Sequence, residues 1–221
     1  MIDTQEKLAA FLPVVNAAAW LAIDTEADSL HAYPEKVCLI QISTAAGDRL
    51  IDPLADMDIT PFLAALAGRE LIFHAADYDL RLLKKHHDFV PTEIFDTMLA
   101  ARLLGEKQFG LGALVEKFLG VKLDKGPQKA DWAQRPLTPR MEIYARNDTR
   151  FLKTLEEKLR AELTAKGRLA AMASASRQCH SSRRTASAGL SRNVLPLMRQ
   201  TSSGSMTGGT ELSAMSRAQL S

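Results

Sequence analysis

Residues 20–26, WLAIDTE, combine an apolar run with two carboxylates that are separated by one residue. The run has the character of a strand, in which side chains at alternate positions point to the same face. Asp24 and Glu26 therefore project side by side and repel each other. Divalent cations relieve such repulsion, because carboxylate oxygens are the ligands that hard ions such as Mg²⁺ prefer. The stretch thus favours a strand that carries half of a metal site.

Strand and helix patterns alternate on both sides of this stretch. Apolar runs typical of further strands occupy residues 36–44, 48–53, 70–75 and 93–97. Helical patterns occupy residues 4–19, 77–87, 98–105, 111–120 and 138–163. Two strands separated by a short Gly-containing segment predict a hairpin, and later strands alternate with helices. This order predicts a mixed sheet with helices on both sides, an α/β or α+β domain of three layers.

Local signals fix several helix ends. Thr4 and Thr138 are suited to N-caps, and Pro139 is suited to the first turn of the last helix. Gly105 is expected to end the helix that precedes it.

The composition excludes several classes of protein. Hydrophobic residues make up 46% of the chain and charged residues 24%, as in ordinary globular proteins. No apolar run approaches the roughly 18 residues of a membrane span. The first ten residues, MIDTQEKLAA, do not resemble a secretory signal, so we expect a cytoplasmic protein. The two cysteines predict no disulfide framework, and Cys38 is expected to be a buried thiol.

The composition changes after Gly167. Residues 171–221 contain six arginines and one acid, which leaves 22 basic and 25 acidic residues in residues 1–170. We expect residues 168–221 to be a disordered basic tail, because few large apolar side chains are present to offset the entropy of ordering. A basic arm for nucleic acid and an out-of-frame remnant of a lost domain are the alternatives. The mildly acidic remainder shows no general footprint for nucleic acid, so binding must be argued from a site.

Further residues extend the acidic pattern. Asp77 and Asp79 follow the fourth predicted strand, and Tyr144 and Asp148 lie one turn apart on the last predicted helix. Convergence of these acids with the first pair would suit two Mg²⁺ or Mn²⁺ ions, which clamp the attacking and leaving oxygens of a phosphodiester. Spacing alone is more typical of solvated acids at the ends of strands and helices than of a metal site.

Five segments in order resemble the ribonuclease D-like 3′–5′ exonucleases, the tyrosine branch of the DEDD superfamily. The segments are AIDTEADSLHAYPEKVCLIQI, LIFHAADYDLRLL, IFDTMLAARLLG, FGLGALVEKFLGVKLDK and DWAQRPLTPRMEIYARND. The resemblance covers about residues 2–165. It implies an RNase H-like (DnaQ-type exonuclease) fold for residues 1–167. It also implies metal-dependent release of nucleoside 5′-monophosphates from RNA 3′ ends, such as those of tRNA.

The resemblance also assigns roles within the site. The metal-ligating acids that it implies for two Mg²⁺ or Mn²⁺ ions are Asp24, Glu26, Asp79 and Asp148. Tyr144 matches the tyrosine that orients and helps to activate the attacking water, and a core tyrosine is the alternative.

Residues around the site carry weaker expectations. Lys125, Gln128 and Arg135 precede the tyrosine helix and are expected to contact the substrate backbone, with a solvated loop as the alternative. His74 lies at a strand end and is expected to contact substrate or to have a structural role. Trp132 is expected to anchor the loop by packing.

Four more residues near helix ends have expected roles. Asp77 is a rival to Asp79 and is suited to capping a helix, as is Asp96, for which we also expect a secondary contribution to the site. His86 and His87 are expected to lie at a solvated helix end.

The chain departs from the family pattern at Ala27, where a bulky aromatic residue is usual, and at Met141, where glutamine is common. Neither position holds a metal ligand, but both are expected to touch the substrate-facing region and so to affect substrate specificity. Ribonuclease D carries helical RNA-binding domains after the nuclease domain, and the basic tail does not resemble them, so we expect the substrate affinity or selectivity to differ from the family norm. A DNA 3′–5′ exonuclease and a catalytically silent nucleic-acid-binding module of the same fold are the alternative functions.

Overall fold

The computed structural model describes residues 1–124, 126–172 and 174 of the 221-residue chain. The elements in chain order are α1 (Gln5–Ala17), β1 (Leu21–Ala27), β2 (Val37–Thr44), β3 (Gly47–Ile51), α2 (Thr60–Leu66), β4 (Glu70–Phe73), α3 (Asp77–His87), β5 (Glu93–Asp96), α4 (Thr97–Leu104), α5 (Leu111–Leu119), α6 (Pro139–Arg150) and α7 (Leu152–Ala165). All of the predicted strands are present, each within a few residues of its expected bounds.

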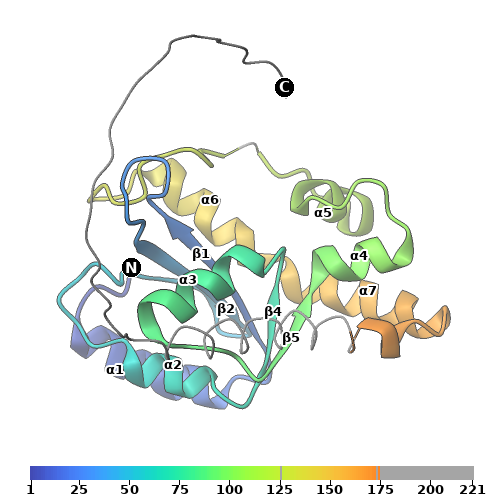
Figure 1. Cartoon of the computed structure of the whole chain (residues 1–221), viewed down its shortest axis with the longest axis horizontal. Coiled ribbons are helices and arrows are strands. Elements are labelled where there is room, and N and C mark those ends of the chain that lie inside the picture. Colours follow the sequence, from blue (N-terminus) through green and yellow to red (C-terminus); the bar gives the residue numbers. More distant parts are fainter. Residues whose placement is uncertain (125, 173, 175–221) are drawn as a thin grey trace, which may run out of the picture.

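The five strands form one mixed sheet in the order β3–β2–β1–β4–β5 (Figure 1). β2 pairs antiparallel with β1 and β3, and the β2–β3 hairpin turns at Ala45 and Ala46 as the sequence predicts. β4 pairs parallel with β1 and β5. β1 is therefore the central strand, with an antiparallel neighbour on one side and a parallel neighbour on the other.

Helices cover both faces of the sheet. On one face α1, α2 and α3 pack on the strands through buried residues such as Leu8, Phe62 and Leu83. On the other face α6 lies across β1, β2 and β3, where Ala145 packs with Leu39 of β2. α4, α5 and α7 pack together beyond β5, at the right of Figure 1. The prediction of a mixed sheet between two helical layers is confirmed.

Capping side chains define several helix ends as predicted. The Thr4 hydroxyl accepts a hydrogen bond from the backbone N–H of Lys7 at 3.3 Å, and the Thr138 hydroxyl accepts one from Met141 at the same distance. Gly105 ends α4 with a φ of 86°, a left-handed conformation that favours glycine.

Two features of the helices differ from the prediction. The last helical pattern was predicted as one segment, but the chain turns at Phe151 and forms two helices, α6 and α7. The turn lets α6 cover the acidic face of the sheet while α7 packs with α4 and α5. The short helix α2, with Pro61 in its first turn, was not predicted.

The packed part of the chain extends beyond Gly167. Leu169 packs against the cluster formed by α4, α5 and α7, and Met172 is buried in it. The rest of the predicted tail, residues 173 and 175–221, lies outside the described residues. Cys38 is a buried free thiol, as predicted. No helix within the described ranges is long and apolar enough to cross a membrane.

Candidate active site

The second half of β1 carries the first acidic pair on the face that α6 covers. α6 is fixed to this face because the Thr149 hydroxyl lies 2.7 Å from the Ser43 hydroxyl of β2. This contact places Asp148, the preceding residue, beside Asp24 and Glu26. One carboxylate oxygen of each of these three acids lies within 4.8 Å of the other two. The structure thus brings together three of the four acids that the resemblance indicates.

Asp79 approaches the same strand from the first turn of α3. It is buried, and its Oδ1 accepts hydrogen bonds from the backbone N–H of Thr25 at 2.9 Å and from the Thr25 hydroxyl at 2.6 Å. Since β4 pairs with β1 only at Leu21 and Ala22, this edge of Thr25 is open to a side chain from α3. Asp79 therefore lies next to the three-acid group rather than in it. Thr25 was not predicted to contribute, because a side chain between Asp24 and Glu26 on a strand points to the opposite face.

Burial raises the pKa of all four of these acids, and neighbouring negative charges raise it further. Burial is the larger cause for Asp24, whose pKa lies well above its usual range, and the charges of Asp79 and Asp148 raise it further. The pKa of Glu26 is raised to about 9 and that of Asp148 to about 7, in both cases first by burial. The pKa of Asp79 is raised to about 6, although its bonds from Thr25 oppose the shift. These acids therefore cannot all be ionised at neutral pH without a compensating positive charge.

The donor set fits a divalent cation. The three converging groups supply only carboxylate oxygens, which hard ions such as Mg²⁺ and Mn²⁺ prefer. The Oδ2 atom of Asp148 is buried and has no hydrogen-bond partner among the described residues. A buried acceptor without a partner is costly, so this atom is suited to a metal ligand. The group could hold a divalent metal ion.

Tyr144 lies one turn before Asp148 on α6. Its pKa is raised above the usual range, first by burial and then by the charges of Asp148 and Glu26. A hydrogen bond with the Gln128 side chain lowers it in part, and the Tyr144 hydroxyl in turn lowers the pKa of Asp148. Gly126 lies directly on the aromatic ring, because a Cβ atom there would be 1.6 Å from Cδ2 of Tyr144. The loop before α6 is thus in close contact with the tyrosine.

The residues expected to bind substrate have different environments. The half-buried His74 has its Nδ1 2.9 Å from the Thr97 hydroxyl, which itself donates to the backbone carbonyl of Phe73. This pairing matches the structural alternative for His74. Gln128 is exposed and reaches Tyr144. Lys125 lies outside the described residues.

Arg135 is already engaged within the protein. Its Nε and Nη2 atoms donate to the two carboxylate oxygens of buried Asp52 at 2.5 and 2.7 Å, and Nη2 also donates to the carbonyl of Cys38 at 2.6 Å. Its Nη1 donates to the carbonyl of Trp132, which is 1% exposed and anchors the loop as predicted. This geometry favours a structural role over a phosphate contact. Met141 is buried in the cluster against which Tyr144 packs, so it can affect the substrate-facing region only through packing.

Asp96 caps α4 as predicted and also supports the start of α3. Its carboxylate accepts from two backbone N–H groups of α4, and from those of Ala75 at 3.0 Å and Ala76 at 2.9 Å in the connection before α3. Asp77 is not the predicted cap. The N-cap of α3 is Ala76, and Asp77 forms an ion pair with Arg81 at 3.3 Å.

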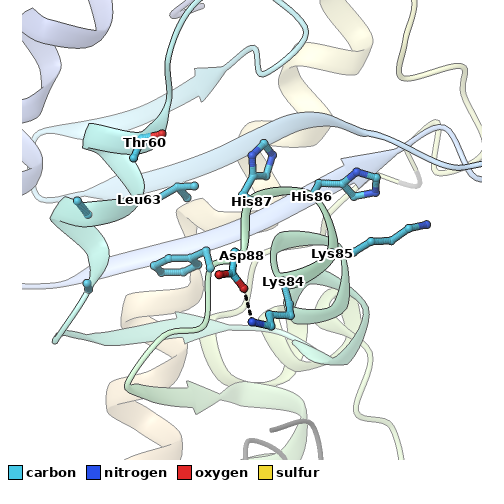
Figure 2. A pocket seen from close by; sticks show the side chains of 10 residues that line it. Thr60, Leu63, Lys84, Lys85, His86, His87 and Asp88 are labelled. Atoms are coloured by element: carbon cyan, nitrogen blue, oxygen red, sulfur yellow. Dashed lines mark hydrogen bonds and ion pairs between the residues drawn. The ribbon is translucent and has the colours of Figure 1, made fainter. Parts of the chain in front are cut away.

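A separate cavity of about 680 Å³ lies between α2 and the C-terminal end of α3 (Figure 2). His86 and His87 line it and are half-buried, so the expectation of a solvated helix end is wrong for both. Lys84 and Lys85 also line it, and each forms an ion pair with a neighbouring acid. The cavity therefore offers little unbalanced charge to a phosphate backbone.

Comparisons with known proteins agree with this geometry. The family described as 3′-5′ exonuclease matches residues 1–164. Ribonuclease D from Zymomonas mobilis is 40% identical over 173 residues, which are 76% of this chain and 44% of that protein. The exosome complex component 10 homolog from Caenorhabditis elegans is 37% identical over 166 residues, which are 74% of this chain and 19% of that protein. The crystal structure of Escherichia coli RNase D superposes with a TM-score of 0.78 and 32% identity, and covers 83% of this chain and 50% of that one.

The mixed sheet, its two helical layers and the acidic face define an RNase H-like domain of the type found in ribonuclease D. The chain belongs to the 3′–5′ exonuclease family. It spans about half the length of the ribonuclease D sequences that it matches.

Proposed function

We propose that this chain is a metal-dependent 3′–5′ exoribonuclease. It would hydrolyse phosphodiester bonds from RNA 3′ ends, such as those of tRNA, and release nucleoside 5′-monophosphates. The observation that carries the proposal is the convergence of three carboxylates within 4.8 Å, with a fourth beside them. Relatives named ribonuclease D support RNA as the substrate.

The acids and the tyrosine have distinct roles in this proposal. Asp24, Glu26, Asp79 and Asp148 would hold two divalent ions, Mg²⁺ or Mn²⁺. When bound, these ions would supply activation of water and stabilisation of the leaving 3′ oxygen. Tyr144 would orient the attacking water through its hydroxyl, which lies close enough to Asp148 to affect its pKa. Sequence preference should be slight, because the site recognises the backbone and the terminal nucleotide.

The surroundings of the site complete the proposal. Lys125 and Gln128 would contact the substrate backbone from the loop before α6, and His74 would act mainly through its bond to Thr97. Arg135 is not among the residues that we propose to contact the substrate, because its guanidinium is bound to Asp52. A domain that ends near residue 172 rather than 167, with a basic tail beyond it, and a cytoplasmic location belong to the same proposal.

Degradation of a 5′-labelled single-stranded RNA with Mg²⁺ or Mn²⁺ tests reaction, polarity and metal together. We expect a ladder that shortens from the 3′ end and releases mononucleotides. Asp24→Asn and Asp148→Asn should each lower the rate at least about 100-fold, because each removes an ionised ligand. Asp88→Asn removes an equal charge at an exposed site at the end of α3 and should leave the rate unchanged.

Two outcomes would favour another function, and a third would exclude the mechanism. Faster hydrolysis of a matched DNA oligomer would indicate a DNA exonuclease. Binding of RNA without hydrolysis in either metal would indicate a catalytically silent binding module. An unchanged rate in both site variants would exclude the mechanism, whatever the substrate.

A further inference from the structure

Gln41 is a buried amide in the middle of β2. Its side chain is 0% exposed, and neither its Nε2 nor its Oε1 has a hydrogen-bond partner among the described residues. Buried amides are nearly always hydrogen-bonded, because an unpaired polar group costs more than an apolar side chain of the same size. The position of Gln41 therefore needs an explanation that packing does not supply.

The strand register places Gln41 beside the acidic group. Asp24 and Gln41 are direct partners across the β1–β2 pair, so their side chains stand on the same face of the sheet. Ser43, two residues further along β2, stands on that face as well and contacts Thr149 of α6 at 2.7 Å. Gln41 thus lies between the strand that carries Asp24 and the helix that carries Asp148.

A second buried atom on this face has the complementary character. Asp148 Oδ2 is a buried acceptor without a partner, and Gln41 Nε2 is a buried donor without a partner. A carboxylate only accepts hydrogen bonds, whereas the amide nitrogen donates two. Each carboxylate oxygen has two lone pairs, so Oδ2 of Asp148 can bind a metal ion and also accept a hydrogen bond from the Gln41 amide if the amide turns toward α6.

We propose that Gln41 is a positioning residue for the acidic site, and that its amide donates to the Asp148 carboxylate when the site holds divalent cations. This inference rests on the proposed function, because it assumes that Asp148 is a metal ligand. Hydrogen-bonded partners of metal-ligating carboxylates orient the ligand, and their loss typically lowers metal affinity about 10–100-fold.

The substitution Gln41→Met separates this role from simple packing. Methionine keeps the length of the side chain and removes both polar atoms, so it should leave the thermal midpoint of the metal-free protein equal or raise it. The affinity for Mn²⁺, measured by calorimetry, should fall about 10–100-fold. In RNA hydrolysis kcat should fall while KM changes little, since the substrate contacts are intact.

Ile42→Val is the matched control, because Ile42 is the next residue of β2 and is buried on the opposite face. It should lower the thermal midpoint and leave the Mn²⁺ affinity unchanged. A Gln41→Met protein that binds Mn²⁺ as the parent does would overturn the proposal.

Should Gln41→Met fail to fold, Gln41→Asn serves instead. It places the amide one methylene short, and an unchanged Mn²⁺ affinity in that variant would overturn the proposal equally. If the parent binds Mn²⁺ but leaves RNA intact, the proposed function fails, while the affinity measurement still decides the role of Gln41.

Discussion

The Asp148→Asn variant should be more stable than the parent when no metal is bound, and the difference in the free energy of unfolding should grow as the pH rises. The pKa of Asp148 is about 7 in the folded chain, against 3.8 for an unperturbed aspartate. Below the lower value Asp148 is protonated in both states and does not affect stability. Between the two values the unfolded chain releases the proton and the folded chain keeps it, so stability falls as the pH rises. Above about pH 7 the loss is complete, and Asp148→Asn removes it.

The size of the effect follows from the shift. A difference of roughly 3 units corresponds to about 4 kcal/mol at 1.36 kcal/mol per unit. At about pH 5 only about a third of the shift has taken effect, so the gain from the substitution should be about 1–2 kcal/mol there. For a domain of this size each kcal/mol changes the melting temperature by about 2–4 °C, so the gain at about pH 8 is on the order of 10 °C.

Thermal unfolding with EDTA between about pH 5 and pH 8 measures this difference. Asp88→Asn is the control, because it removes a charge from a largely exposed side chain and should be neutral at both ends of the range. Added Mn²⁺ should reverse the order, since the parent gains a bound ion and the variant loses a ligand. A stability difference between Asp148→Asn and the parent that does not change with pH would refute the argument from buried repulsion.

Three further substitutions test other contacts of the site. Thr25→Val removes the hydroxyl that donates to Asp79 and should lower the free energy of unfolding by about 1–2 kcal/mol, as measured by urea denaturation, and weaken Mn²⁺ binding. Gly126→Ala places a Cβ 1.6 Å from the ring of Tyr144, so it should displace the ring and lower kcat about 10-fold or more in single-turnover hydrolysis of RNA. Arg135→Lys loses the paired contacts to its buried carboxylate and should cost about 1–3 kcal/mol of stability, while the salt dependence of RNA binding is unchanged.

Each of these expectations has a contrary result. Equal Mn²⁺ affinity in Thr25→Val would show that the hydroxyl does not orient the acid. For Gly126→Ala the matched control is Gly112→Ala in α5, where an added Cβ meets no atom within 4 Å, and equal kcat values for the two variants would contradict the role of Gly126. If the Arg135→Lys protein is as stable as the parent and its RNA binding depends less on salt, the predicted contact of Arg135 with phosphate would be supported instead.

Much of the fold could be predicted because its signals are local. Apolar runs indicated the strands, and the side chains of Thr4, Asp96 and Thr138 mark where helices begin, because they cap the N-termini through bonds to nearby backbone. The break at Phe151 has no glycine or proline to mark it. It depends on which surfaces α6 and α7 cover, and that is a property of the assembled sheet.

The candidate site likewise has features that the local sequence predicts and features that depend on the packing of distant segments. Asp24 and Glu26 share a face because strand side chains alternate, which the sequence alone predicts. The pairing of Arg135 with Asp52, 83 residues away, and the burial of Met141 depend on how distant segments pack. Thr25 illustrates the same limit, because its hydroxyl acquires a partner only when α3 brings Asp79 to the strand.

The central place of β1 in the sheet affects how the site moves. Strands at the edge of a sheet, here β3 and β5, open by local fraying, whereas amides in a central strand exchange with solvent only when the whole domain opens. Asp24 and Glu26 lie in the half of this strand that still pairs with β2 but no longer with β4, where the Thr25 N–H donates to Asp79 instead. We therefore expect the backbone between the two acids to open less readily than the edge strands, although more readily than Ala22, which is paired on both sides.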